Sequence, residues 1–189
     1  MTEQTEILPG EEKTESRRIY DGRVLNLRVD RVTLRGGGSY VREVVEHEPA
    51  VVIVAENDLG QVLLIDQFRY PVNRTVTELP AGVVERGEDA AQAAVRELRE
   101  ETGWKPARIT LAAKFYSSPG FTDEELFLYH ASSLTFDKLP ADEDEFIIPR
   151  FVSKEDVRRM IASGEIVDAK TLVGLYWWLG RVRQTDAVR

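Results

Sequence analysis

The sequence predicts a mixed α+β protein, in which a β-sheet is flanked by helices and a small antiparallel sheet precedes it. Three observations support this fold class. Residues 17–48 alternate apolar and polar side chains around glycine-containing turns, which is typical of paired strands. Residues 50–55, AVVIVA, form an apolar run of strand length, and residues 88–102 have the periodicity of an amphipathic helix. Strands and helices in one chain of this size predict a layered α+β core.

The composition excludes several classes of protein and of metal site. The chain has 189 residues, which suits one main domain with a small additional element. A net charge of −8 argues against a general nucleic-acid binder, which usually has a basic face, although a small anionic ligand needs only local positive charge or a metal. Cysteine is absent, so disulfides and thiolate zinc sites are excluded and a cytoplasmic location is expected. Only two histidines occur, His47 and His130, which argues against a histidine-based metal site.

No feature of the sequence predicts a membrane protein. The longest apolar runs are far shorter than the roughly 20 residues that cross a bilayer. The N-terminal segment is acidic and polar, unlike a signal peptide, and residues 1–16 are expected to be a disordered tail. Residues 17–48 are expected to form the antiparallel sheet, with turns at Asp21–Gly22 and 36–38. Residues 49–185 are expected to form the main domain.

The elements of the main domain follow in order. After the strand at 50–55, a turn at 57–60 leads to a second apolar strand, and residues 76–88 are extended because they contain Pro80 and Gly82. Further strands are expected at residues 109–117, 125–134 and 147–152.

Two helices are expected near the C-terminus. Ser153 is the expected N-cap of the first, which ends before Gly164. Residues 168–182 form the second, with Trp177 and Trp178 in the core or at an interface.

The helix at 88–102 contains an unusual cluster of acids in its last turns, RELREETG at 96–103. Glu97, Glu100 and Glu101 are three and four residues apart, so they share one face, where like charges repel. A helical wheel predicts that an apolar stripe of this helix faces the core. It predicts that the acids lie beside this stripe together with two small residues, Ala90 and Ala93, which leave room for a ligand. The stripe consists of Ala91, Ala94, Val95 and Leu98.

Two interpretations of this cluster are possible. The acids could form a solvated face, with Arg96 and Arg99 as ion-pair partners. Alternatively, they hold a hard divalent cation such as Mg²⁺, which takes carboxylate oxygens and bridges to substrate phosphates. Glu97 and Glu101 at i and i+4 would direct two carboxylates at one ion, and the preceding glycine-containing segment lets the backbone approach it.

The run GVVERGEDAAQAAVRELREETGW resembles the box motif of the Nudix hydrolase family. Gly82 is followed after five residues by Glu88, and after seven more by REL-REETG, ending at Gly103. The family pattern fixes nine positions over 23 residues and eight match, Trp104 being the departure from the usual aliphatic residue. Because that position packs against the core, we expect little functional effect from it.

The resemblance implies an α/β/α sandwich that hydrolyses a nucleoside diphosphate linked to another moiety. In the family, the matching glutamates hold Mg²⁺ or Mn²⁺, together with the backbone carbonyl that precedes the first glycine. The implied metal ligands are Ala81, Glu97, Glu100 and Glu101, and Glu101 is also counted among the catalytic residues. The implied supports of this cluster are Gly82, Glu88, Arg96 and Gly103.

Residues outside the box resemble the ADP-ribose pyrophosphatase branch of the family. Pro119, in Ser118-Pro119-Gly120, stands sixteen residues after Gly103, and QFRY and ELPAG precede the box. By similarity, Arg69, Glu78, Pro119 and Gly120 are expected to contact substrate. The alternatives are a surface salt bridge for the first two and an ordinary turn for the last two.

The acidic segment 142–145 supplies the expected general base. In this branch a loop glutamate at this point of the chain acts as the base, and Glu145 fits best, with Glu143 second. Without the resemblance, the segment would be interpreted as a solvated acidic loop. The branch also implies a homodimer built through residues 17–48, whose small sheet needs a surface to cover it.

The resemblance to this branch implies a Mg²⁺-dependent, homodimeric enzyme that hydrolyses ADP-ribose to AMP and ribose 5-phosphate, and we expect no nucleic-acid or membrane partner. One alternative is hydrolysis of another sugar nucleotide such as GDP-mannose. The other is a nucleotide-sugar sensor without catalysis, which is disfavoured because every glutamate of the box is present.

Overall fold

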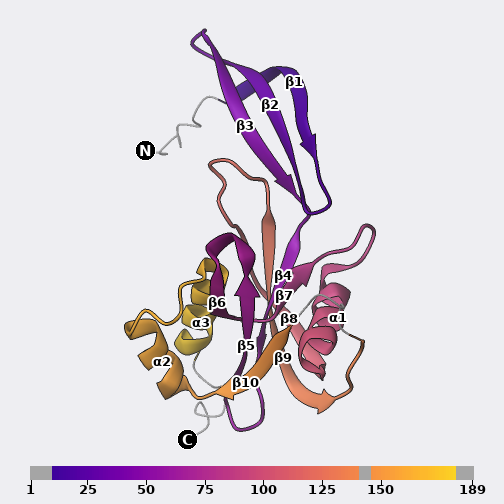
Figure 1. The fold of residues 1–189 in the computed structure, drawn as a ribbon, viewed down its shortest axis with the longest axis vertical. Coiled ribbons are helices and arrows are strands. Elements are labelled where there is room, and N and C mark those ends of the chain that lie inside the picture. Colours follow the sequence, from indigo (N-terminus) through magenta and orange to yellow (C-terminus); the bar gives the residue numbers. More distant parts are fainter. Residues whose placement is uncertain (1–9, 141–145, 182–189) are drawn as a thin grey trace, which may run out of the picture. The chain divides into compact units, whose positions relative to one another are not determined.

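The structure, a computed structural model, describes residues 10–140 and 146–181. The chain divides into two compact units, whose elements are labelled in Figure 1. The first comprises Met1–Glu48 and Ser118–Glu124, and the second comprises Pro49–Ser117 and Glu125–Arg189.

The first unit is the antiparallel sheet predicted from residues 17–48. Its strands, in the order β1-β2-β3, are β1 (Glu11–Asp21), β2 (Leu25–Leu34) and β3 (Ser39–His47). Gly37 and Gly38, in the turn between β2 and β3, have φ values of 87° and 94°, which glycine adopts without strain. The prediction of an antiparallel N-terminal sheet is confirmed.

The start of β1 corrects the prediction of a tail over residues 1–16. That prediction is wrong for residues 11–16, which are paired with β2, Glu11 lying opposite Leu34. The segment lacks an apolar pattern because all of β1 is exposed, so the backbone ladder and polar side chains hold it. The Nε of Arg42 in β3, for example, donates to the Glu11 carboxylate at 2.9 Å.

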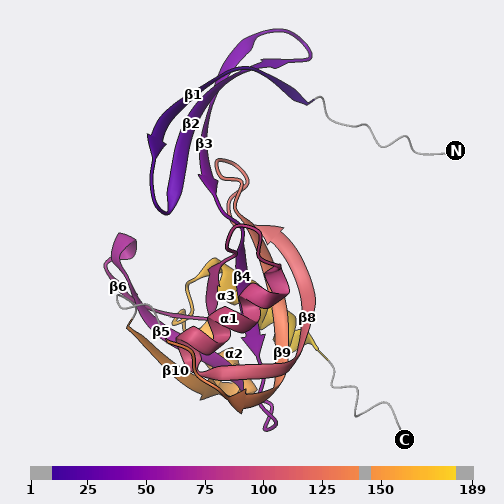
Figure 2. The ribbon, with the colours of Figure 1, turned by 90° about the vertical axis from the view of Figure 1, so that its right-hand side faces the viewer.

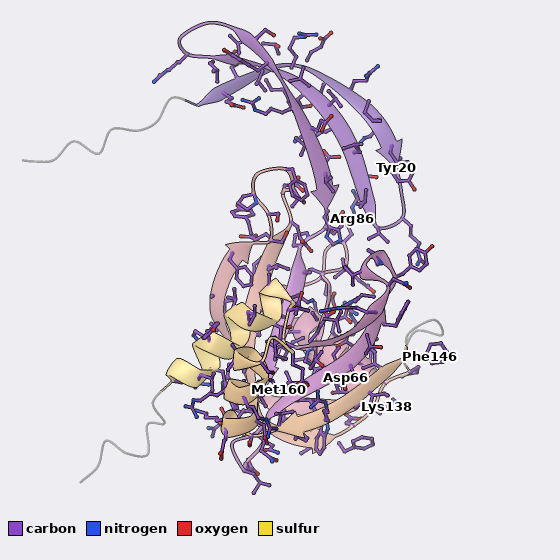
Figure 3. The ribbon with its side chains drawn as sticks, turned by 60° about the vertical axis from the view of Figure 1, so that its left-hand side comes forward. Tyr20, Asp66, Arg86, Lys138, Phe146 and Met160 are labelled. Atoms are coloured by element: carbon purple, nitrogen blue, oxygen red, sulfur yellow. The ribbon has the colours of Figure 1, made fainter. Side chains whose placement is uncertain are left out.

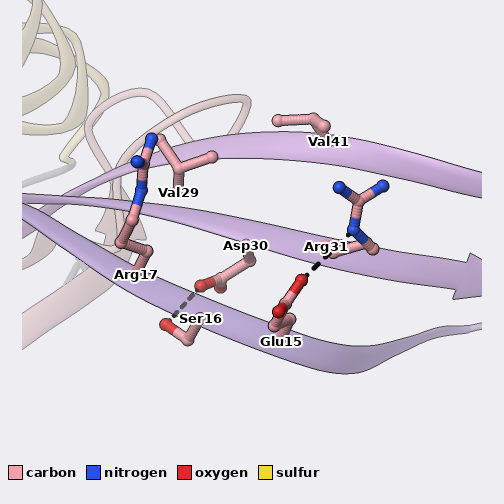
Figure 4. Close-up of a pocket in the computed structure, with 7 residues that line it drawn as sticks. All are labelled: Glu15, Ser16, Arg17, Val29, Asp30, Arg31 and Val41. Carbon is pink, nitrogen blue, oxygen red and sulfur yellow. Dashed lines mark hydrogen bonds and ion pairs between the residues drawn. The ribbon is translucent and has the colours of Figure 1, made fainter.

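Polar pairs between β1 and β2 take the place of a core in this sheet (Figure 4). The Ser16 hydroxyl donates to the Asp30 carboxylate at 2.6 Å, and Arg31 Nε donates to Glu15 at 3.3 Å. Within residues 11–47, Asp30 and Val32 alone are buried. The three-stranded sheet therefore buries little apolar surface by itself.

The segment Ser118–Glu124 joins this unit through β3. The amide of Val45 donates to the Phe121 carbonyl at 2.8 Å, and the His47 amide donates to the Asp123 carboxylate at 3.0 Å. The segment connects two strands of the second unit but folds against the first.

The second unit contains two sheets. The four-stranded sheet has the order β7-β4-β9-β8, with strands β4 (Ala50–Ala55), β7 (Ala81–Val83), β8 (Trp104–Tyr116) and β9 (Glu125–Phe136). Its central pair, β4 and β9, is parallel, and its other pairs are antiparallel. The three-stranded sheet has the order β10-β5-β6, with β5 (Val62–Arg69), β6 (Arg74–Glu78) and β10 (Ile147–Val152). A short 3₁₀ helix, η1 (Tyr70–Val72), connects β5 to β6.

Helices cover both faces of the four-stranded sheet (Figure 2). Val51 and Ile53 of β4 pack in a core cluster with α1 (Ala90–Thr102), whereas Val52 and Val54 pack with the C-terminal helices. Those helices are α2 (Lys154–Ala162) and α3 (Ala169–Gly180). All four β4 side chains are fully buried, as their continuous apolar run predicts. This arrangement confirms the α/β/α sandwich.

In the second unit, side chains of the expected strands and helices contact one another or lie in the core (Figure 3). Met160 of α2 is buried in the core, and Asp66 of β5 accepts from Arg150 Nε of β10 at 3.1 Å. Trp178 of α3 is fully buried, and Trp177 is partly buried beside it. None of the helices within residues 10–140 and 146–181 has the length and apolar character of a membrane span.

The ends of the helices follow local side-chain chemistry. Ser153 caps α2, as predicted, by accepting from the Asp156 amide at 3.1 Å. Asp89 caps α1 and accepts from the Ala91 amide at 2.9 Å, so the helix starts two residues later than expected. Strand β8 begins at Trp104, earlier than the expected residue 109, because Trp104 pairs with Phe136 of β9.

Candidate active site

Helix α1 carries the three glutamates of the box motif at the boundary of the core. Glu101 is buried, and Glu97 and Glu100 are partly buried, so they do not form a solvated face. Gly103 ends the helix with a φ of 79°, and its amide donates to the Arg99 carbonyl at 3.0 Å.

One detail of the helical wheel is wrong. Ala93 is fully buried and packs in the core with Leu98, so it does not leave room beside the acids. Ala91 is partly buried and packs against the core as expected, whereas Val95 is partly buried but is not among the residues of that core cluster. The core therefore reaches α1 from a direction closer to Glu101 than the wheel indicates, which explains why that carboxylate is buried.

Strand β7 runs directly against the acidic turns of α1. A Cβ atom added to Gly82 would lie 2.0 Å from the carboxyl carbon of Glu97, so only glycine permits this approach. The Ala81 amide donates to the Glu101 carboxylate at 3.2 Å. The structure thus brings the Ala81 amide, Gly82 and two of the box glutamates, Glu97 and Glu101, together.

Replacing Gly82 with alanine should displace the Glu97 carboxylate. Because small displacements of reacting groups are costly, we expect kcat/KM to fall by about 10²-fold. Gly180→Ala is the matched control, since a Cβ there meets no atom within 4 Å. Steady-state kinetics of both variants test this expectation. Activity of Gly82→Ala equal to that of Gly180→Ala would show that the close approach has no functional role.

Arg96 binds several of the acids at once. Its Nε and Nη2 donate to the two carboxylate oxygens of Glu88 at 2.9 and 2.8 Å. Its Nη1 donates to Glu97 at 2.7 Å and to Glu100 at 3.1 Å, and Nη2 also reaches the Val83 carbonyl at 3.0 Å. One guanidinium therefore joins the loop before the helix to two of the three box glutamates.

The ion pair between Arg96 and Glu88 changes the acidity of both groups. The hydrogen bond from Arg96 lowers the pKa of Glu88, partial burial opposes this shift, and the Glu85 amide adds to it. The same pair raises the pKa of Arg96 above its ordinary value. Both groups are therefore charged at neutral pH, in a contact that fixes the loop to the helix.

This pKa shift predicts how stability depends on pH. The pKa of Glu88 is lower in the folded state than in the unfolded chain, so its contribution is fully present above the ordinary glutamate pKa of about 4.3. The contribution is lost as the pH falls through the lowered folded pKa. Urea unfolding of wild type and Glu88→Gln between pH 3 and 7 should show a difference in unfolding free energy that shrinks below about pH 4.3. A pH-independent difference would contradict the assignment.

The donor set of α1 and β7 fits a hard divalent cation. Within the described ranges, 10–140 and 146–181, no three histidine, cysteine or acidic side chains already converge as a metal site. Glu97 and Glu100 instead contact Arg96, and Glu101 contacts the Ala81 amide. Nevertheless, the carboxylates of Glu97 and Glu101 lie beside the Ala81–Gly82 stretch of β7, and they offer the oxygen ligands that such a cation prefers.

The two residues expected to contact substrate from β5 and β6 lie together. Arg69 Nε and Nη2 donate to the two oxygens of Glu78, each at 2.8 Å. Glu78 is 2% exposed, so this contact is not a surface salt bridge. Burial raises the pKa of Glu78, but hydrogen bonds from Arg69 and the charge of Lys170 outweigh it and lower that pKa.

Sequence reasoning missed two residues next to this pair. Lys170 binds the Glu78 carboxylate from the first turn of α3, and Asp168 caps that helix by accepting from the Thr171 amide at 2.9 Å. Both line a pocket of about 620 Å³ together with Arg69 and Glu78. The helix cap could have been recognised from Asp168, but no sequence pattern indicates a contact between residues 78 and 170.

The remaining predicted residues belong to the first unit or lie outside the described residues. Pro119 and Gly120 form a turn in Ser118–Glu124, where the Phe121 amide donates to the Ser118 carbonyl at 3.1 Å, and this segment belongs to the first unit. Their contact with substrate stays a prediction. Glu143 and Glu145, the candidates for the general base, lie outside the described residues.

A family model and known proteins match most of the chain. The model of the NUDIX domain matches residues 46–172. The chain is 41% identical over 170 residues to the ADP-ribose pyrophosphatase of Bacillus subtilis (strain 168), covering 88% of this chain and 92% of that protein. It is 36% identical to the methanol dehydrogenase activator of Bacillus methanolicus, covering 88% and 92% of the two chains.

A solved structure has the same fold. The crystal structure of an ADP compounds hydrolase superposes with a TM-score of 0.83, covering 94% of this chain and all of the other, at 21% sequence identity. The matched region of the NUDIX model includes β4 to the start of α3 and all of α1 with its three glutamates. The fold, the glycine-dependent approach of β7 to the acidic helix and these matches together show that the chain belongs to the NUDIX family.

Proposed function

We propose that this protein hydrolyses the diphosphate linkage of ADP-ribose, giving AMP and ribose 5-phosphate, with Mg²⁺ or Mn²⁺ as cofactor. The observation that carries the proposal is the approach of Gly82 to Glu97, with Glu101 bound to the neighbouring Ala81 amide. The similarity to the Bacillus subtilis ADP-ribose pyrophosphatase, over most of both chains, supports the choice of substrate.

The acidic turns of α1 supply the groups that hold the metal. The metal would be held by the carboxylates of Glu97, Glu100 and Glu101 and by the Ala81 carbonyl. When bound, such an ion neutralises phosphate charge and lowers the pKa of water. Arg96 and Glu88, joined by two hydrogen bonds of 2.9 and 2.8 Å, fix the orientation of these ligands.

Other residues bind the substrate and move the proton. Glu145, or else Glu143, accepts the proton of the attacking water, a role typically worth about 10²–10⁴ in rate. Arg69 donates hydrogen bonds to the diphosphate, which suits its planar fork of donors. Pro119 and Gly120 complete the substrate contacts.

We further propose a homodimer formed through the first unit, in the cytoplasm. The support lies in the sheet β1-β2-β3, which exposes apolar side chains, Ile19, Tyr20, Tyr40 and Val41 among them. A three-stranded sheet with little core of its own gains stability by covering these side chains. Size-exclusion chromatography with light scattering should give a dimer, and a monomer at micromolar concentration would remove this proposal.

A substrate panel tests the proposed activity. Purified protein with Mg²⁺ should turn over ADP-ribose faster than ADP-glucose, NADH or GDP-mannose, and EDTA should abolish turnover. Equal or faster turnover of GDP-mannose would overturn the choice of substrate but not the reaction class. Binding of these nucleotides without turnover would instead favour a sensor.

A further inference from the structure

Lys170 contacts the buried carboxylate of Glu78, which also binds Arg69, the candidate substrate-binding arginine. It lies in the first turn of α3, where its Nζ binds Glu78 and is also 3.1 Å from Asp168. Its side chain is 19% exposed, whereas that of Glu78 is 2% exposed. Lysine side chains this far from solvent are usually held by specific partners.

Arg69 contacts Glu78 through only one edge of its guanidinium group. Nε and Nη2 donate to the carboxylate, while Nη1 has no hydrogen-bond acceptor within the described part of the chain. The Arg69 side chain is 37% exposed and lines the pocket of about 620 Å³. An arginine held in this way presents a fixed donor edge to an anionic ligand, since less side-chain freedom is lost on binding.

Lys170 reduces the negative charge around Arg69. Arg69 and Lys170 are cationic, whereas Glu78, Asp168 and Glu101 are anionic, so these five side chains sum to one net negative charge. Without Lys170 the group would carry two net negative charges beside the candidate donor, and this charge would repel a diphosphate more strongly. Arg74 also lines the pocket and adds a further positive charge.

The same helical turn also fixes the backbone that leads to the metal ligands. The Leu79 amide donates to the Thr171 hydroxyl at 2.9 Å in a buried contact. Leu79 follows Glu78 and is two residues before Ala81, whose amide binds Glu101. The first turn of α3 therefore holds both the side chain of Glu78 and the chain that continues into β7.

We propose that Lys170 is a positioning residue, which holds Glu78 and offsets its charge so that Arg69 can bind the diphosphate of a nucleoside diphosphate sugar. This inference rests on the proposed function for the role of Arg69. Lys170 itself is not expected to touch the reacting atoms. Its loss should therefore weaken substrate binding much more than it slows the chemical step.

The test compares Lys170→Met, Lys170→Gln and Lys170→Arg with the control Lys105→Met, which removes a lysine from the half-exposed pair with Asp137. Calorimetry measures ADP-ribose binding in EDTA, and kinetics with Mg²⁺ gives kcat and KM. The neutral variants at 170 should bind ADP-ribose about tenfold more weakly and raise KM equally, with kcat changed less than about threefold. Lys170→Arg should recover most of the affinity, and Lys105→Met should match wild type.

The outcomes separate this inference from the proposed function. Wild-type affinity in the neutral variants, with wild-type circular dichroism, would overturn the role of Lys170 and leave the activity standing. Unfolding of both neutral variants would make Lys170 a structural residue and would also overturn it. If wild type does not hydrolyse ADP-ribose, the proposed activity fails, and the binding comparison is repeated with ADP-glucose and GDP-mannose. If the neutral variants at 170 bind either nucleotide sugar more weakly than wild type and Lys105→Met do, the role of Lys170 is supported. If wild type binds neither, both proposals are overturned.

Discussion

Replacing Glu97 or Glu101 with glutamine is expected to reduce kcat/KM for ADP-ribose by at least about 10³-fold, because under the proposed function each change would remove an anionic ligand of the metal. Both carboxylates lie beside the Ala81–Gly82 backbone. The isosteric change keeps the size of the side chain, and the fold should persist. Steady-state kinetics, circular dichroism and calorimetric Mn²⁺ binding measure these effects.

The control for these variants is Glu155→Gln, an identical change at an exposed position in the first turn of α2. It should leave kcat/KM and Mn²⁺ affinity unchanged, apart from a small loss of helix stability. Full activity in the double variant Glu97→Gln/Glu101→Gln would contradict the metal assignment. Loss of activity with wild-type Mn²⁺ affinity would assign these residues another role in the reaction.

Trp178→Ala should be the most destabilising single change in the core of the second unit. Trp178 is fully buried in the cluster between α3 and the four-stranded sheet, with Lys154 Nζ 5.0 Å from its ring centre. Truncation of a buried aromatic to alanine costs about 3–5 kcal/mol, because it removes apolar contacts and leaves a cavity. At this chain length each kcal/mol lowers the melting temperature by about 2–4 °C. Thermal and urea unfolding measure both quantities.

Trp178→Phe separates packing from hydrogen bonding at the same position. The indole N–H is buried and has no hydrogen-bond acceptor among the residues that the structure describes. Phenylalanine removes this donor and retains an aromatic ring, so the loss should be below about 2 kcal/mol. A loss as large as that of Trp178→Ala would contradict this description, in which the retained aromatic ring keeps most of the packing.

Local sequence signals predicted the parts of the site that lie on continuous elements. Gly103 marked the end of α1, and Ser153 marked the start of α2, because helix caps depend on nearby backbone groups. The spacing of Glu97 and Glu101 predicted their common direction. Gly82 was identifiable from its place in the box motif. The reason for a glycine at this position is its close contact with Glu97, which only the three-dimensional structure shows.

Contacts between distant segments were not predictable from one sequence. Lys170 and Glu78 are 92 residues apart, and neither belongs to a motif that implies the other. Ala93 was assigned to the wrong side of α1, because a helical wheel gives relative directions but not the direction of the neighbouring sheet. The start of β1 was missed because an exposed strand that is held by polar pairs has no hydrophobic alternation.

The central claim is that the acidic helix and β7 form a metal-dependent active site for ADP-ribose. Product analysis by chromatography tests it most directly, with purified protein, ADP-ribose and either Mg²⁺ or EDTA. The account predicts AMP and ribose 5-phosphate in equal amounts with Mg²⁺ and neither product in EDTA. Formation of AMP at the same rate in EDTA, or no cleavage of ADP-ribose by folded protein with Mg²⁺, would contradict it.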